Sequence, residues 1–383
     1  MKTVRDIPVL ENIPVLLRCS LNVPTENGKV VDTFRLRKAL PTIEYLQKKG
    51  ARVVLISHIT GDSHASGVGT DTFLPMYEAM KEFIPRIAFC PVSVGPEARE
   101  AVRTLAPGEV VMLENLRRNA GEMKNDPAFA AQLAELGDVF VQDCFDNCHR
   151  EHASMVGVPK LLPSYAGLLL EEEVTELTKA LAPAHPSLAV ICGAKFSTKE
   201  PVVKKLLQAY DRVFVGGAIA NDFLKAEGHP VGASLTSDAD PEHLRELLQN
   251  PRLLLPLDCI VAPKGAGRAA GHIAGIDDVK ENEAILDAGP KTSAMLADIV
   301  GKAEAVLWNG PLGEYENGFT DGTEALARAI GASSAYSVVG GGDTVAAIES
   351  LHMNDRFSFL STGGGAMLDF LAKGTLPGIT ALG

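Results

Sequence analysis

The sequence predicts an α/β protein made of two doubly wound parallel-sheet domains. Short apolar runs rich in β-branched residues alternate with amphipathic stretches along most of the chain, which is typical of parallel strands connected by crossover helices. The 383 residues exceed the length at which one hydrophobic core stops growing. A stretch of Leu, Glu and Lys at helical spacing also divides the chain near its middle. These observations together predict two domains joined by a helix.

The expected strands are short apolar runs bounded by polar or glycine-containing segments. In the first half they are 14–18, 52–57, 87–90, 110–114 and 139–142, and helical patterns such as 36–49 and 127–136 separate them. In the second half they are 188–192, 212–215, 258–262, 305–308, 336–339 and 358–360. The connecting helix is expected over 168–181, closed by Pro183 and Pro186. The predicted boundaries are 1–165, 166–182 for the linking helix, and 183–366.

Composition excludes several classes of protein. The formal net charge of −12 argues against non-specific binding to nucleic acid, because the phosphate backbone demands a basic surface. The N-terminus lacks an apolar signal core, and no run of about 18 apolar residues predicts a membrane span. We therefore expect a soluble cytoplasmic protein. The six scattered cysteines are typical of reduced thiols.

A zinc site is an alternative for one segment. Cys144, Cys148, His149 and His152 lie within nine residues, and all four are zinc-ligating types. Their spacing lacks the paired loops of usual structural zinc sites. The same segment also belongs to the anion-binding cluster described next.

Polar and basic side chains of the first half follow its predicted strands. In an open α/β sheet the strand ends form the ligand-binding edge. Arg35 comes soon after Thr33, which is expected to cap the next helix. Four arginines and two histidines at one edge would bind a small, multiply anionic molecule, whereas solvated surface charges are the alternative. The residues of this edge are Arg18, Ser20, Asn22, Arg35, His58, Asn115, Arg117, His149 and Arg150.

Two glycine clusters near the C-terminus predict phosphate binding. Residues 340–344 (GGGDT) and 361–366 (STGGGA) each lie where an apolar strand leads into a helical pattern. Glycines let backbone N–H groups approach an anion, and the start of a helix adds unpaired donors. Two such turns imply a polyphosphate ligand, and the Asp343 carboxylate suits the Mg²⁺ that accompanies nucleotides. Plain strand-to-helix connections are the alternative.

Further turns of the second half support the same ligand. Glycines follow the strands that end near 192, 215 and 308. Lys195 and Lys199 are four residues apart, so on the first turn of a helix they would face the same way and reach successive phosphates. Two solvent-facing helix lysines are the alternative interpretation. The half contains neither a Gly-x4-Gly-Lys-Ser/Thr loop nor a nucleophile elbow.

In the order and spacing of these motifs the chain resembles the phosphoglycerate kinase family over nearly its whole length. The resemblance implies the family's fold, with two Rossmann-like domains joined by a helix, an acceptor site on the first domain and Mg-ATP on the second. It also implies hinge closure and a tail, 367–383, that returns to the first domain. The motifs are Asn22-Val23-Pro24, 35–46 (RLRKALPTIEYL), Ser57-His58, 113–117 (LENLR), His149-Arg150, Gly193-Ala194-Lys195, 308–313 (WNGPLG), 340–344 and 361–366.

The implied reaction moves a phosphoryl group from ATP to a carboxylate and forms an acyl phosphate, with 3-phosphoglycerate as the default acceptor and 1,3-bisphosphoglycerate and ADP as the reversible products. A carboxylate is ionised at neutral pH, so the reaction needs no general base, only positioning and neutralisation of charge. By resemblance Arg35 and Lys195 stabilise the phosphoryl group, with Gly341, Gly342, Gly364 and Gly365 donating their amides. The implied nucleotide-binding residues are Lys199, Gly216, Gly217, Asn309, Pro311, Glu316, Gly342, Thr344, Ser361, Thr362, Gly363 and Gly365, with Asp343 on Mg²⁺.

Departures from the family pattern concentrate on the acceptor side. Ser20 replaces an acidic residue, Gly61 replaces an arginine that helps to bind the substrate phosphate, and Asp62 follows it. Asp146 and Glu151 add two more carboxylates. These changes suggest a less anionic carboxylate as an alternative acceptor, such as one bearing an amine that Asp62 or Asp146 could pair with.

Milder departures affect the nucleotide side. They are Thr198, Ala218, and Glu314 in place of an apolar residue near the expected base. A non-catalytic nucleotide-binding relative is a second alternative. A nicotinamide-dependent dehydrogenase is a third, although the chain lacks a convincing Gly-x-Gly-x-x-Gly unit after its first strand. We expect a monomer that binds ATP or ADP and a small carboxylate, without nucleic-acid or membrane partners.

Overall fold

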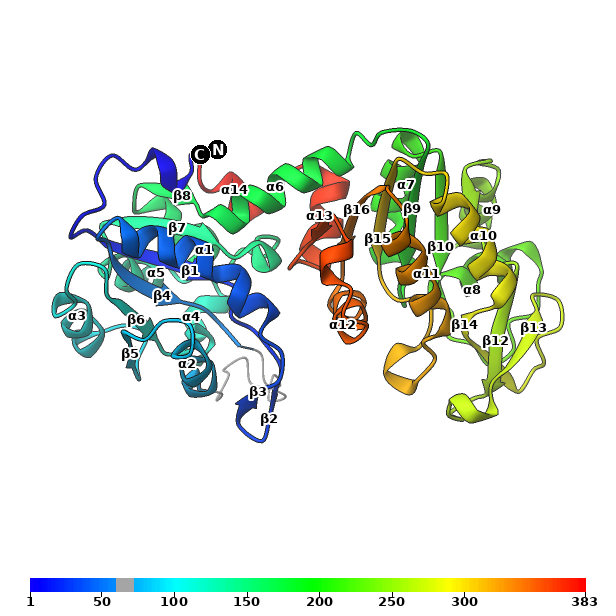
Figure 1. The fold of residues 1–383 in the computed structure, drawn as a ribbon, viewed down its shortest axis with the longest axis horizontal. Helices are drawn as coiled ribbons and strands as arrows, with labels where there is room; N and C mark the ends of the chain where they lie inside the picture. The colour runs from blue at the N-terminus through cyan, green and yellow to red at the C-terminus, as the bar shows by residue number, and fades with distance from the viewer. Residues whose placement is uncertain (60–71) are drawn as a thin grey trace. The chain divides into compact units, whose positions relative to one another are not determined.

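The computed structural model describes residues 1–59 and 72–383, and it divides into two compact units (Figure 1). Unit 1 combines Met1–Thr175 with Thr375–Gly383, and unit 2 comprises Glu176–Gly374. Each unit has a six-stranded sheet in which every pairing is parallel. The predicted α/β class with two parallel sheets is therefore confirmed.

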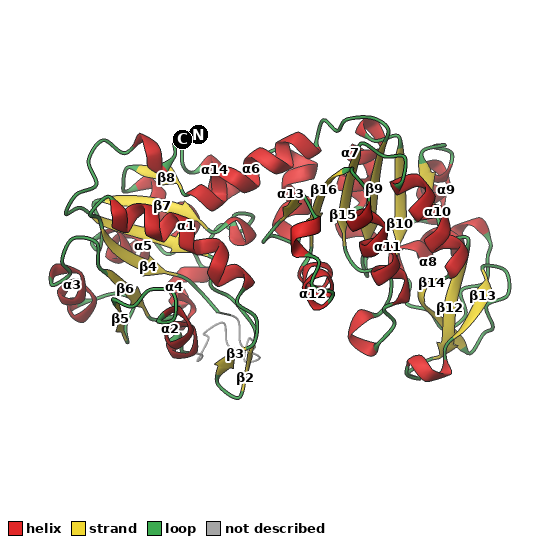
Figure 2. Ribbon diagram, in the orientation of Figure 1, coloured by secondary structure: helices red, strands yellow, loops and turns green. Residues whose placement is uncertain are grey.

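Unit 1 is a doubly wound sheet with the strand order β5-β6-β4-β1-β7-β8 and helices on both faces (Figure 2). The central strand β1 pairs with β4 on one side and β7 on the other, so the winding reverses between β1 and β7. Ligands of such sheets bind at the carboxyl ends of the strands beside this reversal. The strands are β1 (Pro14–Cys19), β4 (Arg52–Ile56), β5 (Ile87–Cys90), β6 (Val110–Leu113), β7 (Val139–Asp143) and β8 (Ser164–Ala166). A hairpin pairs β2 (Thr25–Glu26) with β3 (Lys29–Val30).

Helices α5 and α1 of unit 1 differ in how their first turns are capped. Helix α5 begins with Pro127 after Asp126, whose carboxylate accepts hydrogen bonds from two first-turn amides. Thr33 stands at the N-cap of α1, but its side chain makes no capping hydrogen bond, and Asp32 accepts from the Phe34 amide instead. The expected Thr33 cap was therefore wrong. The helices are α1 (Phe34–Lys48), α2 (Leu74–Met80), α3 (Pro96–Arg103), α4 (Ala120–Met123), α5 (Pro127–Ala134) and α14 (Pro377–Thr380).

Unit 2 repeats the architecture with the order β11-β10-β9-β15-β16-β17. Here β9 is central and the winding reverses between β9 and β15. Strands β9 and β15 are buried at every residue, as expected when helices cover both faces of a sheet. The strands are β9 (Ser187–Cys192), β10 (Arg212–Gly216), β11 (Leu253–Leu254), β15 (Ala305–Asn309), β16 (Tyr336–Gly340) and β17 (Phe359–Leu360). The helices are α7 (Glu200–Ala209), α8 (Ala218–Glu227), α9 (Pro241–Leu248), α10 (Pro290–Val300), α11 (Asp321–Ala332), α12 (Gly342–Ser350) and α13 (Gly365–Lys373).

One predicted strand of unit 2 belongs to a different sheet. The run 258–262 forms β12 (Asp258–Pro263), which pairs antiparallel with β13 (His272–Gly275) and β14 (Glu283–Ala288). Our expectation that it would extend the parallel sheet was wrong. An apolar run of this length suits either kind of sheet, and its partners decide which one it joins.

Helix α6 (Leu168–Ala180) contains the boundary between the units, at Thr175. Its first turn is held by Asp143 at the end of β7, whose Oδ1 accepts from the amides of Leu169 and Leu170 at 3.0 and 3.1 Å. Burial raises the pKa of Asp143 to about 7. The chain re-enters unit 1 at its end, where the Gly378 amide donates to the Cys148 carbonyl at 2.9 Å.

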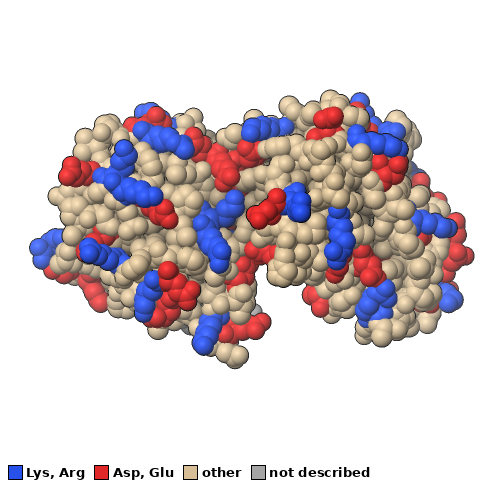
Figure 3. All heavy atoms as spheres, in the orientation of Figure 1, with Lys and Arg blue, Asp and Glu red and all other residues tan. Residues whose placement is uncertain are grey.

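Acidic and basic side chains are interspersed over the face drawn in Figure 3. That face has no broad patch of one sign. Across residues 1–59 and 72–383, no helix has the length and hydropathy needed to cross a membrane.

Candidate functional site

Arg18 is the centre of a buried polar network in unit 1. It is the fifth residue of β1 and its side chain is fully buried. Its Nη2 lies 2.8 Å from His58 Nδ1, and its Nη1 donates to the Cys19 carbonyl at 2.7 Å. Its Nε donates to the Ser154 hydroxyl at 3.0 Å. We predicted Arg18 as a substrate ligand, and in the structure these donors are directed at protein groups.

A buried carboxylate balances this guanidinium. Ser154 lies in a single π-helical turn, Ala153–Gly157, a feature common at functional sites. The Ser154 hydroxyl donates to Glu122 Oε1 at 2.5 Å, and its amide donates to Glu122 Oε2 at 3.0 Å. Glu122 is fully buried on α4. The Ser154 hydroxyl therefore links a buried cation to a buried anion.

The structure brings the predicted arginines and histidines of unit 1 together. Burial, assisted by the charges of Arg18 and Arg117, holds the pKa of His58 well below its usual range. Burial and the same two arginines lower the pKa of His152 from 6.5 to about 4. Both rings are therefore neutral at pH 7 among fixed positive charges. We call this group the cationic cluster; it comprises Arg18, Arg35, His58, Arg117, His149, Arg150 and His152.

Arg117 and Arg150 are two of the arginines of the cluster that reach its surface. Arg117 is half-buried in a short 3-10 turn, and its amide donates to the Asn115 side chain at 3.1 Å. Burial and the nearby Arg18 lower the Arg117 pKa. Its Nε is buried and has no hydrogen-bond partner in the described part of the chain. Arg150 is exposed. The cluster thus has unused positive charge, the property that an anionic ligand requires.

Arg35 lies in the first turn of α1 with its side chain 26% exposed. Its Nη1 donates to the Asn22 carbonyl at 2.7 Å and lies 3.9 Å from Asp146 Oδ2. The other oxygen of Asp146 accepts from the Cys144 thiol at 3.0 Å. Asp146, one of the departures from the family pattern, is thus in contact with the predicted catalytic arginine.

Other predicted acceptor residues differ in their exposure. Ser20 is fully buried, and its hydroxyl has no partner within the described ranges. Asn22 and His149 are half-buried. Gly61 and Asp62, which motivated the alternative acceptor, lie outside the described residues.

The segment considered for zinc is organised differently. Cys144 accepts from Arg18 Nη1 at 3.4 Å, and Cys148 donates to the Cys144 carbonyl at 3.3 Å. Burial raises the pKa of both thiols well above the usual range, which disfavours the thiolates that bind zinc. Within residues 1–59 and 72–383, no group of three or more His, Cys, Asp or Glu side chains is arranged to hold a metal ion.

Four helices of unit 2 begin after glycine, which has no side chain to cap them; Asp258 accepts from first-turn amides of α10, and the other three have no side-chain cap. Helices α8, α12 and α13 follow Gly217, Gly341 and Gly364, and none has a side-chain cap. Gly217 and Gly341 have φ values of 63° and 105°, a conformation that favours glycine. Because the first amides of a helix lack partners within it, these helix starts offer donors to an anion, although in α8 the Ile219 amide already donates to the Gly193 carbonyl at 3.0 Å.

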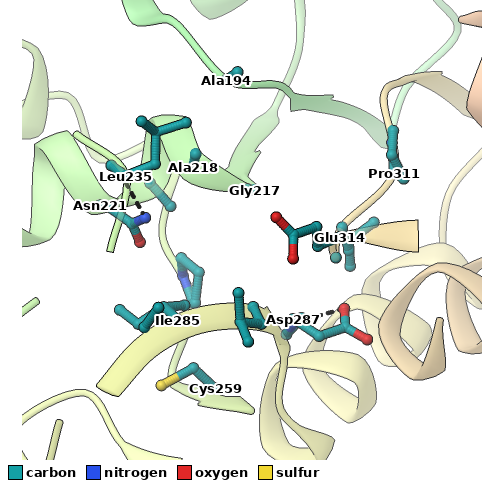
Figure 4. Close-up of a pocket in the computed structure, with 18 of the residues that line it drawn as sticks. Ala194, Gly217, Ala218, Asn221, Leu235, Cys259, Ile285, Asp287, Pro311 and Glu314 are labelled. Carbon is teal, nitrogen blue, oxygen red and sulfur yellow. Dashed lines mark hydrogen bonds between the residues drawn. The ribbon is translucent and has the colours of Figure 1, made fainter. Parts of the chain in front are cut away.

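A pocket of about 580 Å³ lies beside two of these helix starts (Figure 4). That volume is within the range of small-molecule sites. Its apolar walls include Phe214, Leu224, Leu235 and Ile285. Of the predicted nucleotide and metal residues, it brings together Gly216, Gly217, Pro311, Glu316 and Asp343.

The predicted helical pairing of the two lysines was wrong. Lys195 has extended backbone angles and precedes a 3-10 turn, Phe196–Thr198, so the two lysines do not share an α-helical turn. Helix α7 begins only at Glu200, because Pro201 suits a first turn and follows directly. Lys195 is exposed, whereas burial lowers the pKa of the half-buried Lys199. The Lys199 side chain lies over Gly193, leaving 3.0 Å between its Cε and the position of a Cβ there.

Other predicted nucleotide residues form the structural support of this edge. Thr344 is buried, and its hydroxyl accepts from the Gly310 amide at 3.0 Å. Asn309, Ser361 and Thr362 are buried as well. The turn at Gly364 packs against that at Gly341, because a Cβ on Gly364 would lie 3.3 Å from Gly341 Cα. The remaining glycines, Gly342, Gly363 and Gly365, belong to these same two turns.

Asp343 fits the chemistry of a nucleotide-bound Mg²⁺. It is exposed in the first turn of α12 and lines the pocket. Mg²⁺ in nucleotide sites is held by one or two carboxylates together with substrate phosphates and water, so a complete cage of protein ligands is not required. A single exposed carboxylate beside uncapped helix amides meets that requirement.

Several residues of these sites were missed from the sequence. No sequence motif identifies Ser154 and Glu122, and only the fold places them beside Arg18. Asp287 on β14 lines the pocket, where its carboxylate accepts from the amides of Ala288 and Gly322. Burial raises the pKa of Asp287 to about 7. Asn221 on α8 was also missed, because it appears in the sequence as an ordinary helix residue.

Comparison with known proteins places these features in a family context. The family model described as phosphoglycerate kinase matches residues 4–374. A phosphoglycerate kinase of Moorella thermoacetica is 43% identical over 391 residues, which cover 99% of this chain and 98% of the relative. That of Xanthobacter flavus is 41% identical over 393 residues, which cover 100% and 98%.

Solved structures of phosphoglycerate kinases are similar to this chain over nearly its whole length. Phosphoglycerate kinase from Coxiella burnetii matches with a TM-score of 0.82 and 37% identity, covering 99% of this chain and 97% of that one. The enzyme from Pyrococcus horikoshii OT3 matches with a TM-score of 0.89 and 31% identity, covering 100% and 98%.

Proposed function

Because this chain belongs to the phosphoglycerate kinase family, we propose that it transfers a phosphoryl group reversibly between ATP and the carboxylate of 3-phosphoglycerate. The observation that carries the proposal is the set of uncapped helix starts in unit 2 beside a pocket lined by Asp343. That arrangement suits a nucleotide polyphosphate with its Mg²⁺. The product of the forward reaction is an acyl phosphate.

The cationic cluster of unit 1 supports binding of the acceptor. An acceptor with a carboxylate and a phosphate is multiply anionic, and guanidinium groups match both. We assign direct contact to Arg35, Arg117, Arg150 and His149, while Asn22 contributes to the wall. Arg18 and His58 are positioning residues, since they are buried and bonded to one another.

Charge neutralisation is the main catalytic contribution that we assign to this chain. The acceptor carboxylate is ionised at neutral pH and attacks the phosphorus without losing a proton. Arg35 and Lys195 neutralise the charge on the transferring oxygens. The amides of Gly341, Gly342, Gly364 and Gly365 donate to the same oxygens. Asp343 would hold Mg²⁺, which when bound would supply further neutralisation of the phosphates.

The remaining nucleotide contacts are assigned as follows. Lys199 and the Thr344 backbone hold phosphates, and Glu316 accepts from the ribose hydroxyls. The Thr344 hydroxyl accepts from the Gly310 amide and keeps its own O–H to donate to a phosphate oxygen. The wall beside the nucleotide is formed by Gly216, Gly217, Asn309, Pro311, Ser361, Thr362 and Gly363. A monomeric state and a cytoplasmic location stay predictions from the sequence.

An acyl-phosphate trap tests the function directly. The full chain is incubated with ATP, Mg²⁺, 3-phosphoglycerate and hydroxylamine, and hydroxamate is measured. With hydroxylamine present throughout, we expect hydroxamate to form only when ATP, Mg²⁺ and 3-phosphoglycerate are all added. If ADP binds in calorimetry while no hydroxamate forms, the chain is a nucleotide-binding relative without this activity.

A second acceptor class has a specific observation in its favour. Asp146 lies against Arg35 and offers a carboxylate where a phosphate-bearing acceptor needs positive charge. An acceptor bearing an amine would pair with Asp146. The same assay, run with amine-bearing carboxylates in place of 3-phosphoglycerate, separates the two. Higher kcat/KM for 3-phosphoglycerate than for every amine-bearing acid rejects this second class.

A further inference from the structure

We propose that Glu314 makes the nucleotide pocket prefer guanine to adenine, so that the chain uses GTP and GDP at least as well as ATP and ADP. The inference rests on the proposed function and concerns the base of the nucleotide. Contacts to the phosphates do not distinguish one base from another. It starts from a charged side chain in a largely apolar part of the pocket.

Most of the pocket wall cannot distinguish one purine from another. Leu224, Leu235 and Ile285 offer apolar surface that receives any flat base. Discrimination among bases requires polar groups that match the donors and acceptors on the base edge. The polar side chains of the wall therefore decide which base binds.

Two of these polar side chains are already engaged within the protein. The Asp287 carboxylate accepts from the amides of Ala288 and Gly322 at 2.8 and 3.0 Å. Asn221 donates its side-chain amide to the Leu235 carbonyl at 3.0 Å, and its Oδ1 is buried without a hydrogen-bond partner in the described ranges. Both lie in the pocket wall with their hydrogen bonds directed at the protein.

Glu314 differs from Asp287 and Asn221 because its side chain is not hydrogen-bonded to the described part of the protein. Its backbone amide donates to the Leu286 carbonyl at 2.8 Å, which fixes its main chain beside the apolar strand β14. Its side chain lines the pocket across from Asn221 (Figure 4) and is exposed. Within the described ranges its carboxylate makes no hydrogen bond or ion pair, not even with Lys264, the cation that also lines the pocket. It is therefore available to a ligand.

A carboxylate is an acceptor only, and this property selects the base. Guanine presents two neighbouring donors, N1–H and the N2 amino group, which match the two oxygens of a carboxylate. Adenine presents one donor, the N6 amino group, beside N1, whose lone pair repels an approaching oxygen. Hypoxanthine keeps N1–H but lacks the amino group. The expected order of affinity at Glu314 is guanine, then hypoxanthine, then adenine.

Calorimetric titration of the full chain with GDP, IDP and ADP, each with Mg²⁺ at pH 7.5, tests this order. We expect GDP to bind about tenfold or more tightly than ADP, the factor for one further hydrogen bond to a charged group, with IDP between them. Glu314→Gln and Glu314→Val should abolish the preference. Glu281→Gln is the matched control, since Glu281 is an exposed carboxylate of unit 2 that does not line the pocket.

The inference is overturned if the wild-type chain binds ADP as tightly as GDP, or if the preference for GDP survives in Glu314→Val. These binding ratios do not depend on turnover. Absence of hydroxamate together with tighter GDP binding contradicts the proposed function and leaves the base preference standing. Normal hydroxamate formation together with tighter ADP binding contradicts the base preference and leaves the proposed function standing.

Discussion

The Asp146 carboxylate lies 3.9 Å from the guanidinium of Arg35, which we propose stabilises the transferring phosphoryl group. The Cys144 thiol holds the other oxygen of Asp146, and the Asn22 carbonyl accepts from the same Arg35 nitrogen. The carboxylate therefore offsets part of the charge of Arg35 where an anionic acceptor would bind.

Neutralising Asp146 should tighten binding of the acceptor. In Asp146→Asn the shape is kept and the negative charge is removed, so we expect the KM for 3-phosphoglycerate to fall about two- to fivefold, in line with a partly exposed ion pair. Steady-state kinetics at saturating ATP measure it. Glu82→Gln, an exposed charge change in the same unit, should leave the KM unchanged. A higher KM in Asp146→Asn would contradict the prediction.

Removing the Arg35 guanidinium should reduce turnover without weakening the nucleotide complex. We expect kcat of Arg35→Met to fall by about 10³ or more, as when an arginine that meets transition-state charge is removed. The Kd for Mg-ADP should stay unchanged, because the pocket residues belong to unit 2. Arg37→Met, two residues along α1 and exposed, is the control and should keep kcat within about twofold. Equal losses in both variants would indicate a general effect on α1.

Ser154→Ala should destabilise unit 1. The substitution leaves Arg18 Nε and Glu122 Oε1 buried without the hydroxyl that links them, and we expect a loss of about 1 to 3 kcal/mol in the free energy of unfolding. Urea denaturation followed by circular dichroism measures it. Thr104→Ala, which removes an exposed hydroxyl from a helix end, should cost less than about 0.5 kcal/mol. A Ser154→Ala variant as stable as the wild type would show that the link contributes nothing.

His152 should make the protein less stable in mild acid. Its pKa is about 4 in the folded chain against 6.5 as the ordinary value, so below pH 6.5 the unfolded chain binds a proton that the folded chain does not. The contribution of the neutral His152 ring to the free energy of unfolding is complete above pH 6.5 and is lost as the pH falls toward 4. The loss is about 1.4 kcal/mol per pH unit and reaches about 3 kcal/mol.

Urea denaturation of the wild type and His152→Asn from pH 7.5 to 4 tests the prediction. The difference between the two proteins should be constant above pH 6.5. Below that value the free energy of unfolding should fall less steeply in the variant. Parallel curves over the whole range would exclude His152 as the titrating group.

Much of the fold could be predicted because apolar runs and their polar boundaries are local properties. Runs such as 139–142 and 305–308 recur as β7 and β15 with one residue added. The run 258–262 also forms a strand, but its sheet depends on β13 and β14, which no local pattern identifies. Existence of a strand was predictable, and its partners were not.

The candidate site was predictable in its residue types more than in their contacts. The uncapped glycine turns lie at helix starts, as their sequence pattern predicts. The role of Arg18 could not be predicted, because its burial depends on Ser154 and Glu122, which are more than 100 positions away along the chain. The prediction that Lys195 and Lys199 share a helical turn was wrong for a local reason, since Pro201 delays the start of α7.

The return of the chain to unit 1 has a consequence for synthesis. The last nine residues, Thr375–Gly383, belong to the unit that is translated first, and Gly378 packs tightly on Cys148, whose Cα lies 3.1 Å from the position of a Cβ at Gly378. The ribosome therefore releases the final piece of the first unit only after the whole second unit has emerged. A nascent chain stalled before Thr375 carries every residue of unit 2 and an unfinished unit 1.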